Sequence, residues 1–358
     1  MTRTIIPFGP QHPVLPEPVH LTLVCEDDRI EEALPSIGYC HRGIEKAAEA
    51  NNYHKNPYLV ERVCGICNFM HSMCYCQGLE SMMGLEVPIR AKYLRVIWAE
   101  VNRLRSHLLW LGLLADAIGI ESLFMQFWRI RERVVDIIEK TTGARIIFST
   151  NQIGGLRRDI SAEHMNETLD MVKTVAAEVA ELKPVLVNSY TVKARTVGKG
   201  VLTKDKAMEL GAVGPLARAS GLHQDMRLLG YAAYNELEFE PAVEEAGDCH
   251  ARALVRYREV FDSIHLIEQA IKKIPPGPIS VEETDWPQGE AIDRVEQPRG
   301  EVFYFLKGNG TNQLERMKIR TPTFANIPAL LQILPGCELA DVPVITLSID
   351  PCISCTER

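Results

Sequence analysis

Four cysteines in two Cys-x-x-Cys pairs are the residues whose type and spacing point most directly to chemistry. Cys64 and Cys67 form the first pair. Cys352 and Cys355 form the second, which lies close to Arg358, the last residue. Two thiolates at this spacing can bind one metal from a single turn, and four such ligands suit zinc, an iron-sulfur cluster or a soft transition metal. If one site uses both pairs, folding must bring the C-terminus back to the N-terminal third.

The separation of the two pairs weighs against several kinds of cysteine site. Cys67 and Cys352 are 285 positions apart, whereas the pairs of a structural zinc site usually lie within about 20 residues of each other. A thioredoxin-like dithiol requires a strand-to-helix junction in an α/β fold. Ten cysteines in a chain large enough to have a substantial core do not suggest a disulfide framework. We therefore predict metal binding, with a structural zinc protein as a disfavoured alternative.

The composition is that of a globular protein with an acidic surface. The chain has 358 residues, of which 46% are hydrophobic and 24% charged, and its net charge is -8. An acidic balance argues against a nucleic-acid partner, because phosphates are neutralised by basic surfaces. Pro7, Pro10 and Pro13 interrupt any N-terminal signal sequence, and no apolar run reaches the ~18 residues of a membrane span. We expect a cytoplasmic protein that could be peripheral to a membrane complex.

Helical periodicity dominates the middle of the chain, residues 56–274. In the segment 89–114, the apolar residues Leu94, Ile97, Trp98 and Val101 recur at spacings of three and four, which predicts a helix with one buried stripe. A helix over 56–85 is expected to carry the first cysteine pair. Further helices are predicted over 121–141, 161–182, 204–210 and 242–274.

The two ends of the chain have the alternating pattern of β-strands. Residues 1–40 predict a β-hairpin, and residues 279–358 predict a β-rich region in which strands over 301–306 and 314–319 flank Gly308-Asn309-Gly310. The expected fold is mainly α with a smaller β layer (α+β), a bundle of long helices with hairpins from both ends. We expect a single domain, 1–358, whose C-terminal region closes the metal site.

The motifs around both cysteine pairs resemble those of the large subunit of [NiFe] hydrogenases. The first is RVCGICNFMH at 62–71, and the last is DPCISCTER at 350–358. FGPQHP at 8–13, GYCHRGIEK at 38–46 and PRG at 298–300 are similar to motifs shared by energy-converting hydrogenases and the catalytic-core subunit of respiratory complex I. That complex I subunit lacks the metal-binding cysteines, and this chain keeps all four. The chain therefore resembles the membrane-associated, energy-converting type (Ech or CO-induced).

The resemblance implies a Ni-Fe centre whose iron carries CN and CO ligands. Cys64 and Cys352 would be terminal nickel ligands, and Cys67 and Cys355 would bridge nickel and iron. Thiolates suit such a centre because they stabilise nickel in several redox states and a terminal thiolate can accept a proton. The expected fold is that of a [NiFe] hydrogenase large subunit.

Three further residues match catalytic positions of the family. Glu17 would relay protons near a terminal cysteine, because burial can tune a carboxylate for this task; the alternative is an ordinary loop glutamate. Arg299 would lie over the open metal position, donating to cyanide or polarising H2, unless it is a turn residue on the surface. His71 would hydrogen-bond a thiolate from one helical turn beyond Cys67; otherwise it is a core residue.

Four other positions complete the predicted site. Thr323 matches a hydroxyl or backbone donor to cyanide, and Pro298 and Asp350 are expected to line the cofactor. Many family members bind a further Mg or Fe through the equivalent of Glu45 and a C-terminal histidine, but this chain ends in Arg358. Because arginine does not bind cations, an ion pair between Glu45 and Arg358 could replace that metal.

The expected function is reversible conversion of 2H+ and 2e- to H2, with H2 and protons as substrates. Once four cysteines are assigned, no motif remains for an iron-sulfur cluster in this chain. The resemblance therefore implies an iron-sulfur small subunit with a [4Fe-4S] cluster, a ferredoxin-type carrier and integral membrane subunits that move H+ or Na+, with this chain on the cytoplasmic side of the membrane. The alternative of another class is a non-catalytic coupling subunit of a complex I-like assembly. Whether a C-terminal extension has been removed stays open.

Overall fold

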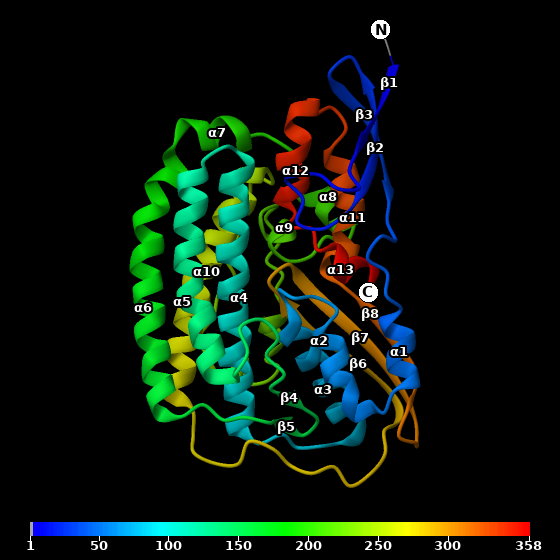
Figure 1. Cartoon of the computed structure of the whole chain (residues 1–358), viewed down its shortest axis with the longest axis vertical. Helices are drawn as coiled ribbons and strands as arrows, with labels where there is room; N and C mark the ends of the chain where they lie inside the picture. Colours follow the sequence, from blue (N-terminus) through cyan, green and yellow to red (C-terminus); the bar gives the residue numbers. More distant parts are fainter. Residues whose placement is uncertain (1–2) are drawn as a thin grey trace.

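The structure is a computed structural model, and it describes residues 3–358. Long helices gather on one side, and the sheets and both chain ends lie on the other (Figure 1). Helix α4 packs against α5 and α10, and α6 packs against the same two helices, so these four form a bundle. Their bounds are α4 (Ile89–Ala117), α5 (Glu121–Thr142), α6 (Ala162–Lys183) and α10 (Cys249–Lys273). The predicted mainly α fold with a smaller β layer is confirmed.

Helix α4 is buried on almost every side, and the single buried stripe predicted for it is too narrow. Bundle helices cover one side of α4, while α12 and the loop carrying the first cysteine pair contact it elsewhere. The charged residues Glu100, Arg103 and Arg105 are at most 1% exposed. They tolerate burial because each is hydrogen-bonded. A helix buried all round is typical of the centre of a large protein.

Two antiparallel three-stranded sheets come from the two ends of the chain. The N-terminal sheet has the order β1 (Arg3–Phe8), β2 (His20–Glu26), β3 (Arg29–Ser36), and the C-terminal sheet has the order β6 (Gln288–Gln297), β7 (Gly300–Asn309), β8 (Leu314–Arg320). The hairpins β2–β3 and β7–β8 were predicted, and β1 and β6 extend them to three strands. A small ladder joins β4 (Asn151–Gln152) to β5 (Gly155–Leu156).

The continuous helix predicted over 56–85 is wrong, because the first cysteine pair interrupts it. Two helices form the region, α2 (Asn56–Glu61) and α3 (Asn68–Met83), and a separate helix, α1 (Ile44–Ala50), precedes them. The gap holds both cysteines in a turn. Arg42 donates to the carbonyl oxygens of Arg62 and Val63, so these groups are satisfied outside a helix. Helix α3 then packs against β6 and β7.

Two other boundaries differ from the predictions. Helix α10 begins at Cys249 rather than at 242, because the Asp248 side chain caps it by accepting from the Ala251 amide at 2.7 Å. The C-terminal region is β-rich only as far as Arg320. Beyond it lie α11 (Pro322–Ile333), α12 (Val342–Ser348) and α13 (Ile353–Glu357); the remaining short helices are α7 (Tyr190–Thr196), α8 (Lys204–Glu209) and α9 (Pro215–Arg218).

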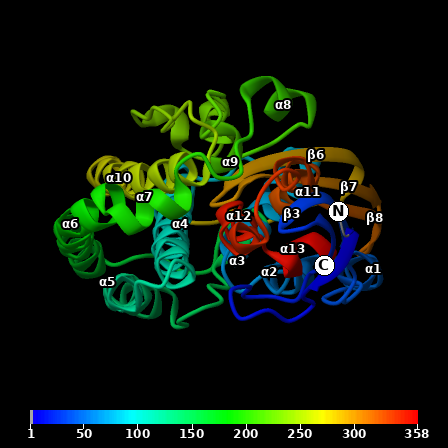
Figure 2. The same ribbon diagram turned by 90° about the horizontal axis from the view of Figure 1, so that it is seen from above.

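The last helix returns to the N-terminal part of the molecule. Seen from above, α13 and the C-terminus lie on the same side as the N-terminal strands and α2 (Figure 2). Helix α13 also packs against α11. Within residues 3–358, no helix combines the length and the apolar character that crossing a membrane requires. The fold thus places the second cysteine pair beside the first.

Candidate metal centre

The two cysteine pairs form one buried cluster. Cys352 Sγ lies 3.3 Å from Cys64 Sγ, and Cys67 Sγ lies 3.3 Å from Cys355 Sγ. The Cys64, Cys67 and Cys355 sulfurs all lie within 4.8 Å of one another. All four side chains are at most 2% exposed, and none forms a disulfide. Four soft ligands therefore converge from segments at opposite ends of the chain.

Backbone groups hold each cysteine in place. The amides of Ile66 and Cys67 donate to Cys64 Sγ at 3.2 and 3.5 Å. The Thr323 hydroxyl accepts from the Cys352 amide at 3.1 Å, so this predicted cofactor residue orients the backbone of the second pair. Pro322 and Thr323 begin α11, whereas Cys352 precedes α13.

The contacts among the cysteines give their thiols different pKa values. Hydrogen bonds from Cys352, Cys355 and Cys67 lower the pKa of Cys64 well below its usual value. Burial raises the pKa of Cys67, but hydrogen bonds from Cys352 and Cys355 outweigh it and lower the value to about 7. Burial and the neighbouring sulfurs raise the pKa of Cys355. In the metal-free chain, negative charge is therefore favoured on the first pair.

Arg299 and Asp350 form a buried pair at the cluster. Arg299 Nε donates to the Asp350 carbonyl oxygen at 2.9 Å, and Nη2 donates to Asp350 Oδ1 at 2.7 Å. Among the described residues, Arg299 Nη1 and Asp350 Oδ2 have no hydrogen-bond partner although both are buried. Burial opposes the charge on Arg299, but Asp350 and the thiolates of Cys352 and Cys64 raise its pKa. A donor and an acceptor are thus available to a ligand near the sulfurs.

His71 contacts a sulfur, as expected, and the structure identifies which one. His71 Nε2 lies 3.4 Å from Cys355 Sγ, and Nδ1 lies 2.8 Å from the Tyr304 hydroxyl. The two ring nitrogens therefore connect the second cysteine pair to β7. Tyr304 was missed at the sequence level because it belongs to no motif and is brought to His71 only by the packing of α3 on the sheet.

Glu17 reaches the cluster through the residue between the ligand cysteines. Its carboxylate accepts a hydrogen bond from the Ser354 amide at 2.9 Å and another from the Ser354 hydroxyl. Glu17 is also one of the residues, 11–13 and 15–18, that line a hollow of about 540 Å³. The residue thus contacts the segment of the second pair and borders this hollow.

Glu45 is paired with cations, and a metal does not fit there. Arg358 Nε donates to Glu45 at 2.9 Å, Lys318 Nζ at 2.7 Å and the Ile319 amide at 3.0 Å. Although burial opposes ionisation, the hydrogen bonds from Lys318 and Arg358 lower the pKa of Glu45. Two cationic side chains occupy the oxygens that would bind Mg or Fe. The geometry therefore favours the predicted ion pair over the further metal.

Buried arginines near the cluster suit an anionic group. Arg105 and Arg256 are at most 1% exposed, and within residues 3–358 neither of them has a carboxylate in ion-pair contact. Arg256 instead lies over the ring of Trp110, 4.1 Å from its centroid, and burial lowers its pKa to about 10 while the charge of Asp350 opposes this. Buried cations require nearby negative charge. Four thiolates with a Ni-Fe centre would supply it, so the donor set fits that group.

Comparisons with known proteins agree with this donor set. Residues 42–116 match the family model "Nickel-dependent hydrogenase", and residues 117–286 and 279–358 match "Respiratory-chain NADH dehydrogenase, 49 Kd subunit". The carbon monoxide-induced hydrogenase of Rhodospirillum rubrum is 39% identical over 361 residues, covering 100% of both chains. The chain belongs to this family of nickel-dependent hydrogenase and 49 kDa subunits.

Other members of the hydrogenase and 49 kDa family share nearly the whole chain. The membrane-bound hydrogenase subunit alpha of Pyrococcus furiosus is 39% identical, over 99% of this chain and 87% of that protein. A chain of the membrane-bound sulfane sulfur reductase, an archaeal respiratory membrane complex, superposes with a TM-score of 0.95 at 32% identity, covering 99% of this chain and 98% of that one. The family relationship predicted from the motifs is confirmed, and with it an oxidoreductase-related role.

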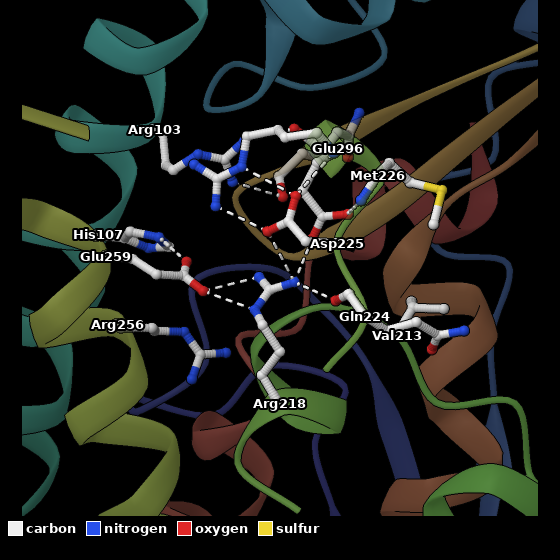
Figure 3. Close-up of polar contacts among 12 residues, drawn as sticks. Arg103, His107, Val213, Arg218, Gln224, Asp225, Met226, Arg256, Glu259 and Glu296 are labelled. Atoms are coloured by element: carbon white, nitrogen blue, oxygen red, sulfur yellow. Dashed lines mark hydrogen bonds and ion pairs between the residues drawn. The ribbon is translucent and has the colours of Figure 1, made fainter. Parts of the chain in front are cut away.

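Behind the site, this family member has a buried ion network that the sequence did not reveal (Figure 3). Arg218 of α9 donates to Glu259 at 2.9 Å and to Glu296 at 2.8 Å, and His107 of α4 lies 2.7 Å from Glu259. Arg103 of α4 donates to the backbone oxygens of Glu296 at 2.7 Å and of Gln297 at 3.0 Å. The network therefore secures the end of β6, directly before Pro298 and Arg299.

The C-terminal segment is held by residues whose roles were also missed. Arg42 donates to the Ser354 carbonyl oxygen at 3.0 Å as well as to the first cysteine loop. The Glu357 carboxylate accepts from the amides of Gly38 and Cys40. His41 Nδ1 lies 2.7 Å from the Glu357 carbonyl oxygen. The GYCHRGIEK motif could have indicated these contacts, because four of the six residues lie in it.

Proposed function

We propose that this chain is the catalytic subunit of an energy-converting [NiFe] hydrogenase, which converts 2H+ and 2e- to H2 reversibly. The observation that carries the proposal is the convergence of four buried cysteine sulfurs from the two Cys-x-x-Cys pairs. A Ni-Fe centre with CN and CO ligands would supply the redox chemistry and the binding of hydrogen. The chain's own residues would hold this centre, exclude water and move protons.

The sulfur pairing supports the division of ligand roles. Cys64 and Cys352, proposed as terminal nickel ligands, lie side by side at 3.3 Å. Cys67 and Cys355, proposed to bridge nickel and iron, form the other contact of 3.3 Å. Each proposed pair of ligands thus meets in one contact, and the family resemblance assigns the terminal role to the first pair of sulfurs and the bridging role to the second.

Polar residues around the sulfurs have proposed roles of their own. Arg299 and Asp350, with Pro298 beside them, would line the open side of the centre and donate to cyanide through the free Arg299 Nη1. Thr323 would orient the Cys352 backbone. His71 would hydrogen-bond the Cys355 thiolate and so limit its electron donation.

Glu17 is the proposed proton carrier. Its carboxylate receives the Ser354 hydroxyl, and it also borders the hollow formed by residues 11–18. A proton released at the sulfurs would pass to Glu17, which contacts the residue between Cys352 and Cys355, and then to water; the reverse path would serve proton reduction. Proton supply is required in either direction of the reaction.

The remaining partners follow from what the chain lacks. The four ligand cysteines leave no iron-sulfur motif in the sequence, so electrons would come through a small subunit with a [4Fe-4S] cluster from a ferredoxin-type carrier. Several relatives are named as subunits of membrane complexes. We propose that this chain is peripheral to such a complex, on its cytoplasmic side, with membrane subunits that move H+ or Na+.

The alternative function is a non-catalytic coupling subunit of a complex I-like assembly. It is favoured by the match of residues 117–358 to the 49 kDa family model. A coupling role does not require four thiols in contact, and their retention in one cluster therefore argues for the catalytic role.

Metal analysis and infrared spectroscopy of the purified complex test the proposal. We expect nickel and iron together with CN and CO stretching bands, and we expect Cys67→Ser to lose the bands and H2 activity. Cys74→Ser is the matched control, because Cys74 is equally buried on α3 but is not part of the cluster. A complex with intact cysteines but without nickel or these bands would support the coupling alternative, and zinc in its place would support the structural zinc site.

A further inference from the structure

Arg105 of α4 holds the turn that carries the first cysteine pair. Its Nη2 donates to the carbonyl oxygens of Gly65 at 3.0 Å and of Ile66 at 2.7 Å. Its Nη1 donates to the Ile146 carbonyl oxygen at 3.0 Å, and the side chain is 1% exposed. The guanidinium is therefore fixed between the cysteine turn and the loop after α5.

The peptide groups that accept from Arg105 also donate to a sulfur. The Gly65–Ile66 peptide directs its N–H at Cys64 Sγ, 3.2 Å away, and the Ile66–Cys67 peptide directs its N–H at the same sulfur, 3.5 Å away. Donation to a carbonyl oxygen polarises the whole peptide and strengthens its N–H as a donor. Two parallel paths of hydrogen bonds therefore run from one guanidinium to one sulfur.

The charge of Arg105 has no other obvious compensation. Within residues 3–358, no carboxylate forms an ion pair with it, and its contacts are to neutral backbone oxygens. Burial lowers the pKa of Arg105 to about 10, and negative charge on Cys64 and Cys67 opposes this shift. A buried cation whose hydrogen bonds all go to neutral groups requires a nearby anion. The thiolates of the first pair are suitably placed.

We propose that Arg105 is a positioning residue for Cys64: it fixes both peptides of the cysteine turn with their N–H groups on the sulfur and withdraws electron density from it. This inference rests on the proposed function, because it assigns Cys64 as a ligand. Hydrogen bonds to a metal-bound sulfur reduce its electron donation and raise the reduction potential of the site. Arg105 thus acts on the centre without touching it.

The test compares Arg105→Gln, Arg105→Lys and Arg131→Gln in the intact complex. Gln removes the charge, and Lys keeps it but lacks the planar fork with which the guanidinium donates to both the cysteine turn and the loop after α5. Arg131 of α5 is the control. Its charge lowers the pKa of Arg105, but its Nη1 donates to Glu132 at 3.2 Å rather than to the cysteine turn. Thermal unfolding establishes that each variant is folded.

Infrared spectra give the electronic readout. Because the sulfur donates more strongly without Arg105, we expect the CO band of Arg105→Gln to shift to lower wavenumber and its midpoint potential to become more negative. Arg105→Lys should fall between the wild type and Gln, and Arg131→Gln should match the wild type. Unshifted bands in folded Arg105→Gln, or an equal shift in Arg131→Gln, would overturn the proposal.

Hydrogen exchange separates this inference from the proposed function. In the full chain produced without nickel, we expect the Ile66 and Cys67 amides to exchange faster in Arg105→Gln than in the wild type, with Arg131→Gln unchanged. Equal exchange in Arg105→Gln and the wild type would contradict the positioning role. Absence of nickel and CO bands from the wild type would instead contradict the proposed function, while the exchange result would still show whether Arg105 holds the turn.

Discussion

At the scale of single residues, Glu17 allows a clean separation of proton transfer from metal binding. The Glu17 carboxylate accepts a hydrogen bond from the Ser354 amide at 2.9 Å. Gln in its place retains an oxygen that can accept this hydrogen bond, but it cannot carry a proton. We expect Glu17→Gln to lower H2 turnover by about 100-fold or more, because proton transfer by a positioned side chain contributes at least that much. The CN and CO bands should keep their positions.

The control for this prediction is Glu32→Gln, which removes an exposed carboxylate from β3 in the same N-terminal region. Its turnover should equal that of the wild type. If Glu17→Gln retained full turnover, the proton would have to leave by another route.

The sequence was most informative for residues whose chemistry demands a fixed type. Cysteine spacing and the neighbouring motifs predicted that the four cysteines meet, that Arg299 belongs to the site and that Glu45 pairs with Arg358. In the structure the cysteines form one cluster, Arg299 pairs with Asp350, and Arg358 donates to Glu45. Tyr304 and Arg105 could not be predicted in this way. They act through the packing of whole elements, and their side chains match no ligand spacing.

At the scale of elements, the loop before α9 supports the turn that carries Arg299. Gly214 has φ +68°, and a Cβ there would overlap the Arg299 carbonyl oxygen and the Gly300 Cα. We expect Gly214→Ala to cost about 1 to 3 kcal/mol for a backbone conformation (φ +68°, ψ -150°) that is nearly restricted to glycine and a further ~1 to 3 kcal/mol for the overlap. The displaced turn should also shift the CN bands, because Arg299 is the proposed cyanide donor. Thermal unfolding and infrared spectroscopy measure the two effects.

Gly211→Ala is the matched control in the same loop. Gly211 has φ +64°, and a Cβ there meets nothing within 4 Å. Gly211→Ala should lower the free energy of unfolding only through its positive φ, and it should leave the CN bands unshifted. Equal destabilisation and equal spectra in the two variants would mean that the close approach of Gly214 does not support the turn.

Helix α4 shows why element-level prediction from the sequence stops short. The spacing of three and four identified the helix, but it treated charged positions as exposed. Arg103, Arg105 and His107 are instead buried, and the two arginines donate to backbone oxygens that flank the metal site from different segments. Such contacts depend on partners 39 to 194 positions away in the chain. No local pattern encodes them.

At the scale of the whole molecule, the distance between the cysteine pairs predicted closure of the chain, and the structure shows how the closure is held. Arg42 contacts both cysteine segments, and Glu357 accepts from the backbone at Gly38 and Cys40. The helical bundle was predictable from periodicity. The exact breaks in it were not, because the turn at 62–67 is fixed by hydrogen bonds from distant residues.

Asp293 should make the stability of the whole fold depend on pH. It is partly buried on β6, accepts a hydrogen bond from Gln77 Nε2 at 3.3 Å and lines a pocket with Glu80, Lys92 and Arg95. Burial raises its pKa from 3.8 to about 7, so between pH 4 and 7 the folded chain binds more protons than the unfolded chain. Stability therefore falls as pH rises through this window, by up to about 4 kcal/mol, and then levels off. In urea denaturation, Asp293→Asn should match the wild type near pH 4 and exceed it at pH 8. Asp170→Asn is the control, because Asp170 is exposed, and its stability relative to the wild type should not change between pH 4 and pH 8. A constant difference in stability between Asp293→Asn and the wild type across this window would contradict this source of pH dependence.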